Sequence, residues 1–290
     1  MNKFIIISIM ILGALPGMSQ DKSSEPVKKN RKFYAGISYS YMNMDLKLTS
    51  LSNYSNWDGV PETKDFTDDQ IGEINSFIDR TNTVNSLNVE FGMTLLDKPD
   101  SRWQITGKLM AGIAATNLEL YNKNSESKEA SFSSGFSRPN FGVGFNFVYN
   151  FNQHWGLALN PLFMGTVGTS GTIVDPVNQD PVNFSVTRKD NYRTFYEHIS
   201  LLARYRIGNF AFEAGPGFYW INSYHKYTIE RTNLSTGLLR IDETTSNAIP
   251  KSFIDCTLGA EWQIIDPLTV YAHAGIGSDL AIMTGIHFNF

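Results

Sequence analysis

The chain has 290 residues, enough for one large domain or two ordinary ones, and 42% of them are hydrophobic while only 18% are charged. Its net charge of -4 disfavours nucleic acid and acidic lipid as main partners, so no nucleic-acid function is expected. Aromatic residues, mostly Phe and Tyr, make up 13% of the chain.

The first 19 residues predict a cleaved secretory signal peptide. Lys3 gives a basic start, residues 4–15 are apolar, and Gly17-Met18-Ser19 has small residues at its first and third positions. The apolar stretch is too short to span a membrane, which takes roughly twenty residues. We expect cleavage between Ser19 and Gln20 and a periplasmic segment over residues 20–32, with a buried N-terminal strand as the alternative.

The single cysteine, Cys256, limits how an exported chain can be held together. It has no partner for an internal disulfide, and it lies far from the cleavage site, where a lipoprotein anchor would need it. No later stretch is apolar enough to predict a transmembrane helix. The mature protein is therefore expected to be secreted, periplasmic, or inserted in a membrane as strands.

After residue 32, apolar residues keep to one parity in segment after segment, which is the period-2 pattern of β-strands. A helix would need a period near 3.6. Odd positions of residues 140–149, for example, hold Phe141, Val143, Phe145, Phe147 and Tyr149. Ten strands are predicted, over residues 33–48, 84–96, 102–121, 137–150, 154–173, 192–207, 210–228, 250–265, 268–277 and 280–290.

The connections between these strands alternate in length. Long connections are predicted at 49–83, 122–136, 174–191 and 229–249, and short ones at 97–101, 150–153, 208–209, 266–267 and 278–279. An even number of antiparallel strands with short turns at one end and long loops at the other is typical of an outer-membrane barrel. We therefore predict an all-β fold, a transmembrane antiparallel up-and-down β-barrel over residues 33–290, with a large soluble β-sandwich as the alternative.

Aromatic residues beside the short turns favour the barrel. On the apolar parity they form a candidate interfacial girdle of Trp103, Tyr149, Trp155 and Trp262. Phe288 and Phe290 share this parity in the last strand. Phe290 is therefore predicted to lie in the girdle and to be recognised by the barrel-assembly machinery during insertion, with outer-membrane lipids as the lasting partner.

These features resemble the outer-membrane β-barrel proteins of Gram-negative bacteria. The resemblance rests on the signal peptide, the ten alternating strands and the final Phe290, and it covers about residues 33–290. Gln20 after a small residue and the strands rich in Tyr, Phe, Gly and Asn are similar to the outer-membrane β-barrel family common in Bacteroidota. The resemblance implies export across the inner membrane and an outer-membrane location, but no single activity.

Charged and polar side chains on the opposite parity predict a network inside the barrel. A lone charge in a narrow barrel is costly, so these groups are expected to pair. The network comprises Glu90, Lys108, Arg204, Arg206, Glu213, Asp255, Glu261, Tyr271 and His287, with His198 and His273 on the same parity. A barrel of about ten strands is little wider than the eight-stranded barrels that side chains fill, so we predict a mostly occluded polar lumen, with a small gated pore as the alternative.

Turn lengths predict which of these groups face one another. A two-residue turn at Gly208-Asn209 places Arg204 opposite Glu213. The loop at 97–101 places Glu90 opposite Lys108. The same counting brings together Glu261, Tyr271 and His287 on three successive strands, which we interpret as a hydrogen-bonded network rather than a catalytic relay.

Enzymatic sites known from barrels of this size are not supported. An omptin-like protease has an Asp-x-His pair, but Tyr271 precedes His273 and Tyr196 precedes His198 at that spacing. Outer-membrane lipid hydrolases carry His-x-Ser, and His198-Ile199-Ser200 has this spacing with Glu197 beside it, yet His198 and Ser200 are predicted to face the lumen. No catalytic residue, metal site or cofactor is predicted.

The connection 49–83 is expected to hold a short amphipathic helix. Thr67 and Gln70 form a capping-box start, and Phe66, Ile71 and Ile74 follow at helical spacing. The helix is expected to lie on the outer leaflet, cover the barrel mouth or contact an extracellular partner. Altogether the sequence predicts a non-enzymatic outer-membrane barrel with surface loops for interaction; a narrow passive porin-like channel and a membrane-embedded hydrolase of lipid or peptide are the alternatives.

Overall fold

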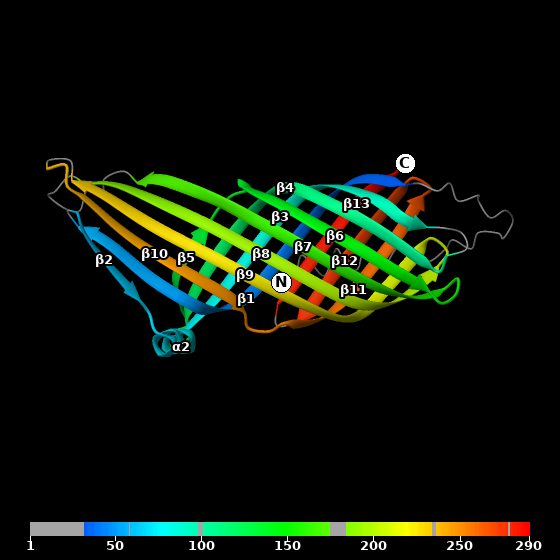
Figure 1. The fold of residues 1–290 in the computed structure, drawn as a ribbon, viewed down its shortest axis with the longest axis horizontal. Coiled ribbons are helices and arrows are strands. Elements are labelled where there is room, and N and C mark those ends of the chain that lie inside the picture. Colours follow the sequence, from blue (N-terminus) through cyan, green and yellow to red (C-terminus); the bar gives the residue numbers. More distant parts are fainter. Residues whose placement is uncertain (1–31, 58, 98–100, 175–183, 234–235, 278) are drawn as a thin grey trace. The chain divides into compact units, whose positions relative to one another are not determined.

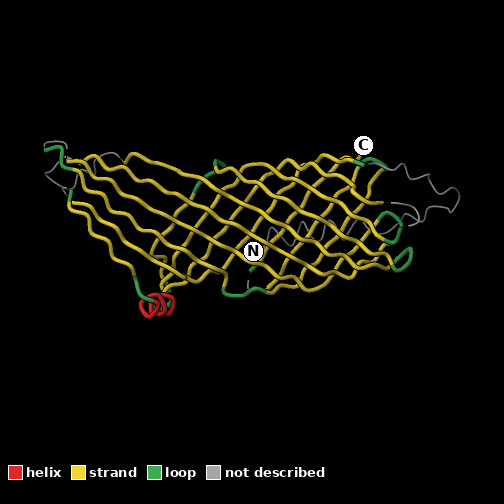
Figure 2. The backbone as a smooth tube through the Cα atoms, viewed as in Figure 1, coloured by secondary structure: helices red, strands yellow, loops and turns green. Residues whose placement is uncertain are grey.

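The computed structural model describes residues 32–57, 59–97, 101–174, 184–233, 236–277 and 279–290. In these residues an antiparallel sheet closes on itself as a barrel (Figures 1 and 2). The predicted signal peptide and the segment 20–31 lie outside the described residues. The barrel fold predicted from the sequence is thus confirmed.

The sheet contains 13 strands, and one described helix, α2, lies between the second and third. The elements are β1 (Phe33–Trp57), β2 (Val60–Asp65), α2 (Asp68–Phe77), β3 (Ile78–Asp97), β4 (Trp103–Asn122), β5 (Ser127–Ser133), β6 (Arg138–Asn150), β7 (Trp155–Val174), β8 (Phe184–Ile207), β9 (Phe210–Asn233), β10 (Leu239–Pro250), β11 (Ile254–Ile265), β12 (Leu268–Gly277) and β13 (Leu280–Asn289).

At the end with the short turns, the ring runs β1, β3, β4, β6, β7, β8, β9, β11, β12, β13 and back to β1. Further along, β10 takes the place of the last three strands by pairing with β9 on one side and β1 on the other. Along β1, the pairing with β13 stops at Asn43 and the pairing with β10 starts at Leu46. Between them, at the tip of the β12–β13 hairpin, the Asp279 carboxylate accepts a 2.7 Å hydrogen bond from the Asp45 amide. The wall therefore loses strands, and narrows, away from the short turns.

The predicted long loops were wrong over most of their length. Residues 49–57, 60–65, 78–83, 184–191 and 239–249 are strands, and residues 122–136 contain β5. These extensions are rich in Thr, Asn and Ser. Beyond an apolar environment a strand has no need to alternate apolar with polar residues, so the period-2 pattern that predicts strands is absent there.

Within the ring, side chains alternate between an apolar outer face and a lumen. On β3, for example, Val89 is 64% exposed on the outside, while Asn88 and Glu90 are each 1% exposed inside. The outward positions of β9 run from Phe210 to Trp220, which at roughly 3.3 Å per residue and a tilt of about 40° rise about 25 Å. This is the height of the apolar band on transmembrane barrels.

Aromatic rings meet at the rim of the barrel that carries the short turns, which we call the lower rim; the opposite end is called upper. Trp103 packs edge-on against Tyr149 with centroids 5.0 Å apart, and Trp262 stacks on Phe210 at 5.4 Å. The ring closes here, because the Phe290 amide donates to the Phe33 carbonyl at 2.9 Å. All six predicted girdle residues lie on the outer face of this rim: Trp103, Tyr149, Trp155, Trp262, Phe288 and Phe290.

The predicted helix is present as α2, and its capping box is confirmed. The Thr67 amide donates to Gln70 Oε1 at 3.0 Å, and the Gln70 amide donates to Thr67 Oγ1 at 3.4 Å. Asn75 bonds both the amide and the carbonyl of Leu48, at 2.9 and 3.0 Å, where the β1 pairing is irregular. The helix thus satisfies backbone groups of β1 between its pairings with β2 and β3. In the described part of the chain, no helix is long and apolar enough to cross a membrane.

Candidate functional site

The lumen holds most of the chemistry-bearing side chains, and its lowest layer is centred on Arg204. Arg204 bonds Glu261 Oε2 at 2.8 Å and lies 3.3 Å from Glu213 Oε1. Asn160 donates to the other Glu213 oxygen at 3.3 Å. Arg204 and Glu213 are at most 5% exposed, so one guanidinium links three strands through two carboxylates in a water-poor setting.

A second ion pair lies beside it on β3 and β4. Lys108 Nζ is 3.7 Å from Glu90 Oε1, which also accepts a 2.7 Å bond from the Tyr271 hydroxyl. The Lys108 ammonium lies 5.3 Å from the centre of the Tyr271 ring. Tyr271 also packs near His273 and His287, with centroids 5.7 and 5.8 Å away. The network thus surrounds Tyr271 with an anion, a cation and two imidazoles.

The register within this layer agrees with turn-length counting in one hairpin and departs from it in two. Arg204 lies directly opposite Glu213, as the two-residue turn predicts. Lys108 lies opposite Gly92 rather than Glu90, because Leu96 pairs with Ile105 instead of Arg102 beyond the turn, and the bulge between Thr94 and Leu96 takes back only one of these three residues.

The last hairpin shows the second departure. Tyr271 lies opposite Glu261 but pairs with Gly285 on β13, while His287 pairs with Thr269. The predicted side-by-side trio was therefore wrong at His287, which is a diagonal neighbour of Tyr271. Next to the turn, Leu280 pairs with Ile276 rather than with Gly277, which moves β13 by one residue relative to the predicted register.

Asp255 and His198 form a separate cluster higher on the inner wall. His198 Nε2 lies 3.1 Å from Asp255 Oδ2, and Thr257 Oγ1 donates to Asp255 Oδ1 at 2.8 Å. A Cβ on Gly217 would collide with all three side chains, and one on Gly275 would meet the Asp255 carboxylate. These glycines on β9 and β12 make the space that the cluster occupies.

The cluster does not have the geometry of a nucleophile–histidine–acid relay. Such a relay places the acid on one imidazole nitrogen and the hydroxyl on the other. Here Asp255 and Thr257 both approach Nε2 of His198, at 3.1 and 3.3 Å. His198 and Ser200 point into the lumen, whereas Glu197, which directly precedes His198 on β8, belongs to the outer face. The arrangement supports a structural role, in which hydrogen bonds from His198 hold β8 to Asp255 and Thr257 of β11.

The middle of the lumen also contains an apolar cluster, which the sequence analysis did not predict. Thirteen buried side chains from opposite walls form one cluster, which we call the plug: Met42, Met44, Leu46, Val84, Met110, Ala114, Met164, Tyr196, Tyr219, Ile221, Ala248, Tyr271 and Met283. None of them is more than 8% exposed. Five of the nine methionines in the sequence lie here, and their flexible side chains suit an irregular interior.

A chain of polar contacts runs along the wall beside the plug. Asn140 Nδ2 donates to Asn88 Oδ1 at 2.6 Å, and Thr166 donates to Asn140 Oδ1 at 2.7 Å. Gly112 lies between Asn88 and Asn140 on the sheet, and a Cβ there would collide with the Leu87 carbonyl. Gly112 therefore lets two amides bond across an intervening strand.

Above the plug, Asp190 is held between Arg138 and His225. Burial raises the pKa of Asp190, but the hydrogen bond from His225 and the charges of His225 and Arg138 outweigh it and hold the pKa below its usual range. Phe132 of β5 packs on the rings of His225 and Tyr227, with centroids 4.8 and 5.1 Å away. Because β5 pairs with β4, on another part of the wall from β9, this contact crosses the lumen near its upper end.

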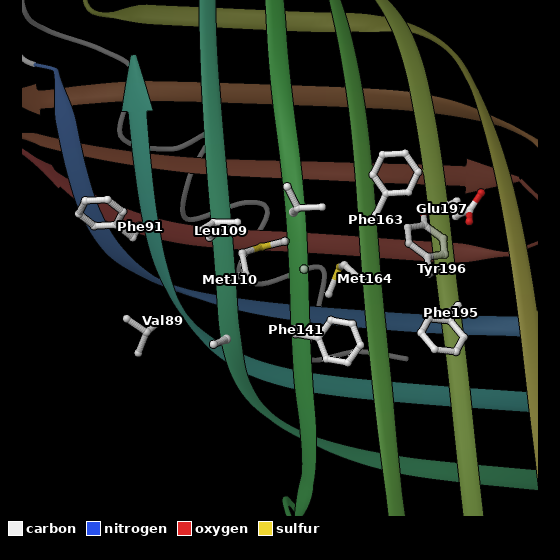
Figure 3. Close-up of a pocket in the computed structure, with 13 residues that line it drawn as sticks. Val89, Phe91, Leu109, Met110, Phe141, Phe163, Met164, Phe195, Tyr196 and Glu197 are labelled. Atoms are coloured by element: carbon white, nitrogen blue, oxygen red, sulfur yellow. The ribbon is translucent and has the colours of Figure 1, made fainter. Parts of the chain in front are cut away.

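The outer face carries an apolar groove of about 640 Å³ across β3, β4, β6, β7 and β8 (Figure 3). Its lining includes Phe91, Leu109, Phe141 and Phe163, and Glu197 supplies a carboxylate. The plug residues Met110, Met164 and Tyr196 also contribute to it. Outward and inward side chains of the same strands therefore both border this space.

Within the described ranges, no group of three or more His, Cys, Asp or Glu residues is arranged to hold a metal ion. Cys256 is exposed on the outer face of β11.

No protein-family model and no curated protein matches the sequence. Solved structures similar to it include the outer membrane protease OmpT from Escherichia coli, at 8% identity and a TM-score of 0.38, covering 93% of this chain and 99% of that one. Another is the translocator domain of autotransporter NalP from Neisseria meningitidis, at 6% identity and a TM-score of 0.38, covering 99% and 96%. A third is the outer membrane protein OprG from Pseudomonas aeruginosa, at 9% identity and a TM-score of 0.34, covering 91% and 99%.

Proposed function

We propose that this chain is a non-enzymatic integral outer-membrane β-barrel whose lumen is closed and whose long strands present a surface for interaction outside the membrane. The observation that carries the closed lumen is the plug. Side chains of β1, β3, β4, β7, β8, β9, β10, β12 and β13 meet in it with at most 8% exposure. Side chains so little exposed to water leave little room for a solute to pass between them.

The outer surface supports the membrane location. An apolar band about 25 Å high with aromatic rings at the lower rim is what a barrel needs to contact lipid tails and interfaces. A soluble protein rarely leaves so continuous an apolar surface in water. Outer-membrane lipids are the proposed partner of this band, and insertion by the barrel-assembly machinery remains a prediction, as does the resemblance to the Bacteroidota family.

The extensions of β1, β8, β9 and β10 support a role outside the membrane. In Figure 1 these strands continue far beyond the β12–β13 hairpin. β2, at the edge of this extension, is exposed along all six of its residues. A long wall with an exposed edge is a larger interaction surface than the 49–83 loop expected from the sequence.

A narrow channel is the first alternative, favoured by the charged layer around Arg204. Planar-bilayer recording separates the two functions. The wild-type barrel should show no steady unitary conductance, while a variant with Met110→Ala, Met164→Ala and Met283→Ala should conduct, because three side chains leave the plug. Met93→Ala, on the outer face, is the matched control and should remain silent. Uniform conductance steps from the wild type would favour the channel.

A hydrolase is the second alternative, favoured by the His198–Asp255–Thr257 cluster. The wild type and a His198→Ala variant should be equally inactive toward phospholipid and peptide substrates. Activity in the wild type that His198→Ala abolishes would establish the hydrolase instead.

A further inference from the structure

Arg80 on β3 is a buried cation without a carboxylate partner among the described residues. Its side chain is 5% exposed, and its single hydrogen bond runs from one terminal nitrogen to Ser246 Oγ at 3.0 Å. The other terminal nitrogen and Nε are buried with no bond to the protein. Burial lowers the pKa of Arg80 to about 10, so the guanidinium is still charged at neutral pH.

Other polar groups surround the same space above the plug. The Asn82 oxygen is buried without a partner, while its NH2 group donates to the Tyr192 hydroxyl. Thr194 and Ser223 flank the same tyrosine hydroxyl from β8 and β9. Four strands, β3, β8, β9 and β10, thus direct hydroxyls, an amide and a guanidinium toward one part of the lumen.

The charge in this part of the lumen is unbalanced. Asp190 is already held by Arg138 and His225, and no carboxylate of the described residues contributes to the pKa of Arg80. Arg80 is therefore left with one uncompensated positive charge, and an isolated buried charge costs several kcal/mol. A native fold that keeps such a residue normally gives it a counter-ion.

We propose that the upper lumen binds a single small inorganic anion, a halide such as chloride, at the free guanidinium nitrogens of Arg80. Nε and the free terminal nitrogen point two N–H groups at it, and the Thr194 and Ser223 hydroxyls rotate to donate. Asn82 completes the set, because an amide presents either its oxygen or its NH2 group to such a space.

The burial of the site sets the class of ligand. Asn82 and Ser223 are 0% exposed, and Thr194 is 2% exposed. Side chains packed this closely admit nothing larger than a single atom, and they exclude sugars and phosphate esters. A monatomic anion carries the charge that water lacks, so halide rather than water is the expected occupant.

The test is anomalous diffraction from bromide-soaked crystals of the full barrel, together with thermal unfolding in bromide and in gluconate at equal ionic strength. We expect an anomalous peak within hydrogen-bonding distance of Arg80 and a higher melting temperature in bromide. Arg80→Met should lose this difference in melting temperature, since losing a charged hydrogen bond weakens binding by about ten- to hundredfold. Arg193→Met, at an outward arginine packed on Tyr224, should keep it.

Two results would overturn the proposal. One is a bromide-soaked wild-type crystal with no anomalous peak at Arg80, which would leave water as the occupant. The other is an equal melting temperature in bromide and gluconate for the wild type. Both readouts use the wild-type chain, so they decide the matter even where Arg80→Met fails to fold.

Discussion

Replacing Arg204 by methionine should destabilise the barrel far more than replacing either of its carboxylate partners. Arg204 is the cation that lies beside both Glu213, at 3.3 Å, and Glu261, at 2.8 Å. Methionine keeps much of the side-chain volume but leaves the Glu213 and Glu261 carboxylates without the cation between them, and Glu213 is only 3% exposed. Breaking a buried pair from one side costs about 3–5 kcal/mol.

The carboxylate variants should cost less. Glu213→Gln leaves Arg204 paired with Glu261 and keeps a polar partner for Asn160, so about 1 kcal/mol is expected. The triple variant Arg204→Met, Glu213→Gln and Glu261→Gln removes all three charges together. It should recover most of the loss, because a buried ion pair contributes little beyond the cost of burying its charges.

The assay is denaturant unfolding of the purified barrel in lipid vesicles, for the wild type and each variant. The free energies should be strongly non-additive, with the triple variant more stable than Arg204→Met alone. Additive losses, or an Arg204→Met variant as stable as Glu213→Gln, would show that the three side chains do not interact as the structure has them.

Three further outcomes are expected. Gly217→Ala should lower stability by about 1–3 kcal/mol, because a Cβ collides with the His198–Asp255–Thr257 cluster, while Gly135→Ala, in open space, should be silent in the same unfolding assay. The lowered pKa of Asp190 means that its contribution is present above the ordinary carboxyl pKa of about 3.9 and lost as pH falls below it; the melting temperature should therefore fall more steeply with acid for the wild type than for Asp190→Asn, and parallel curves would contradict this. Asn75→Ala should increase hydrogen exchange at the Leu48 amide, whose bond it removes, without change at Val89; unchanged exchange at Leu48 would mean that α2 does not protect β1.

The membrane-crossing part of the fold could be predicted from the sequence because each strand there faces two different environments. The same alternation identified the inward charges and, across the tight turn at Gly208, the Arg204–Glu213 pair. The residue at which two strands begin to pair beside a turn is not visible in an alternation pattern, so Lys108 and His287 were placed two residues out of register. The strand extensions were missed because both of their faces are polar.

The plug and Arg80 were missed for different reasons. The methionines lie on the inward parity, and Met42, Met44, Met110, Met164 and Met283 together are a signal that could have predicted an apolar lumen. Arg80 fell within a segment interpreted as a loop, where a charged residue is unremarkable. Only the pairing of β3 with β1 brings it inside the barrel, opposite Ser246.

The accessibility of a thiol placed inside the plug tests the closed lumen most directly. In a Cys256→Ala background, Ala114→Cys introduces the thiol at a position that is 0% exposed, and Ser127→Cys introduces one on exposed β5. A charged, membrane-impermeant thiol reagent added to the folded barrel should modify Ser127→Cys quickly and leave Ala114→Cys unmodified until the barrel is denatured. Modification of Ala114→Cys at the rate of Ser127→Cys would show that water crosses the lumen and would contradict the closed barrel.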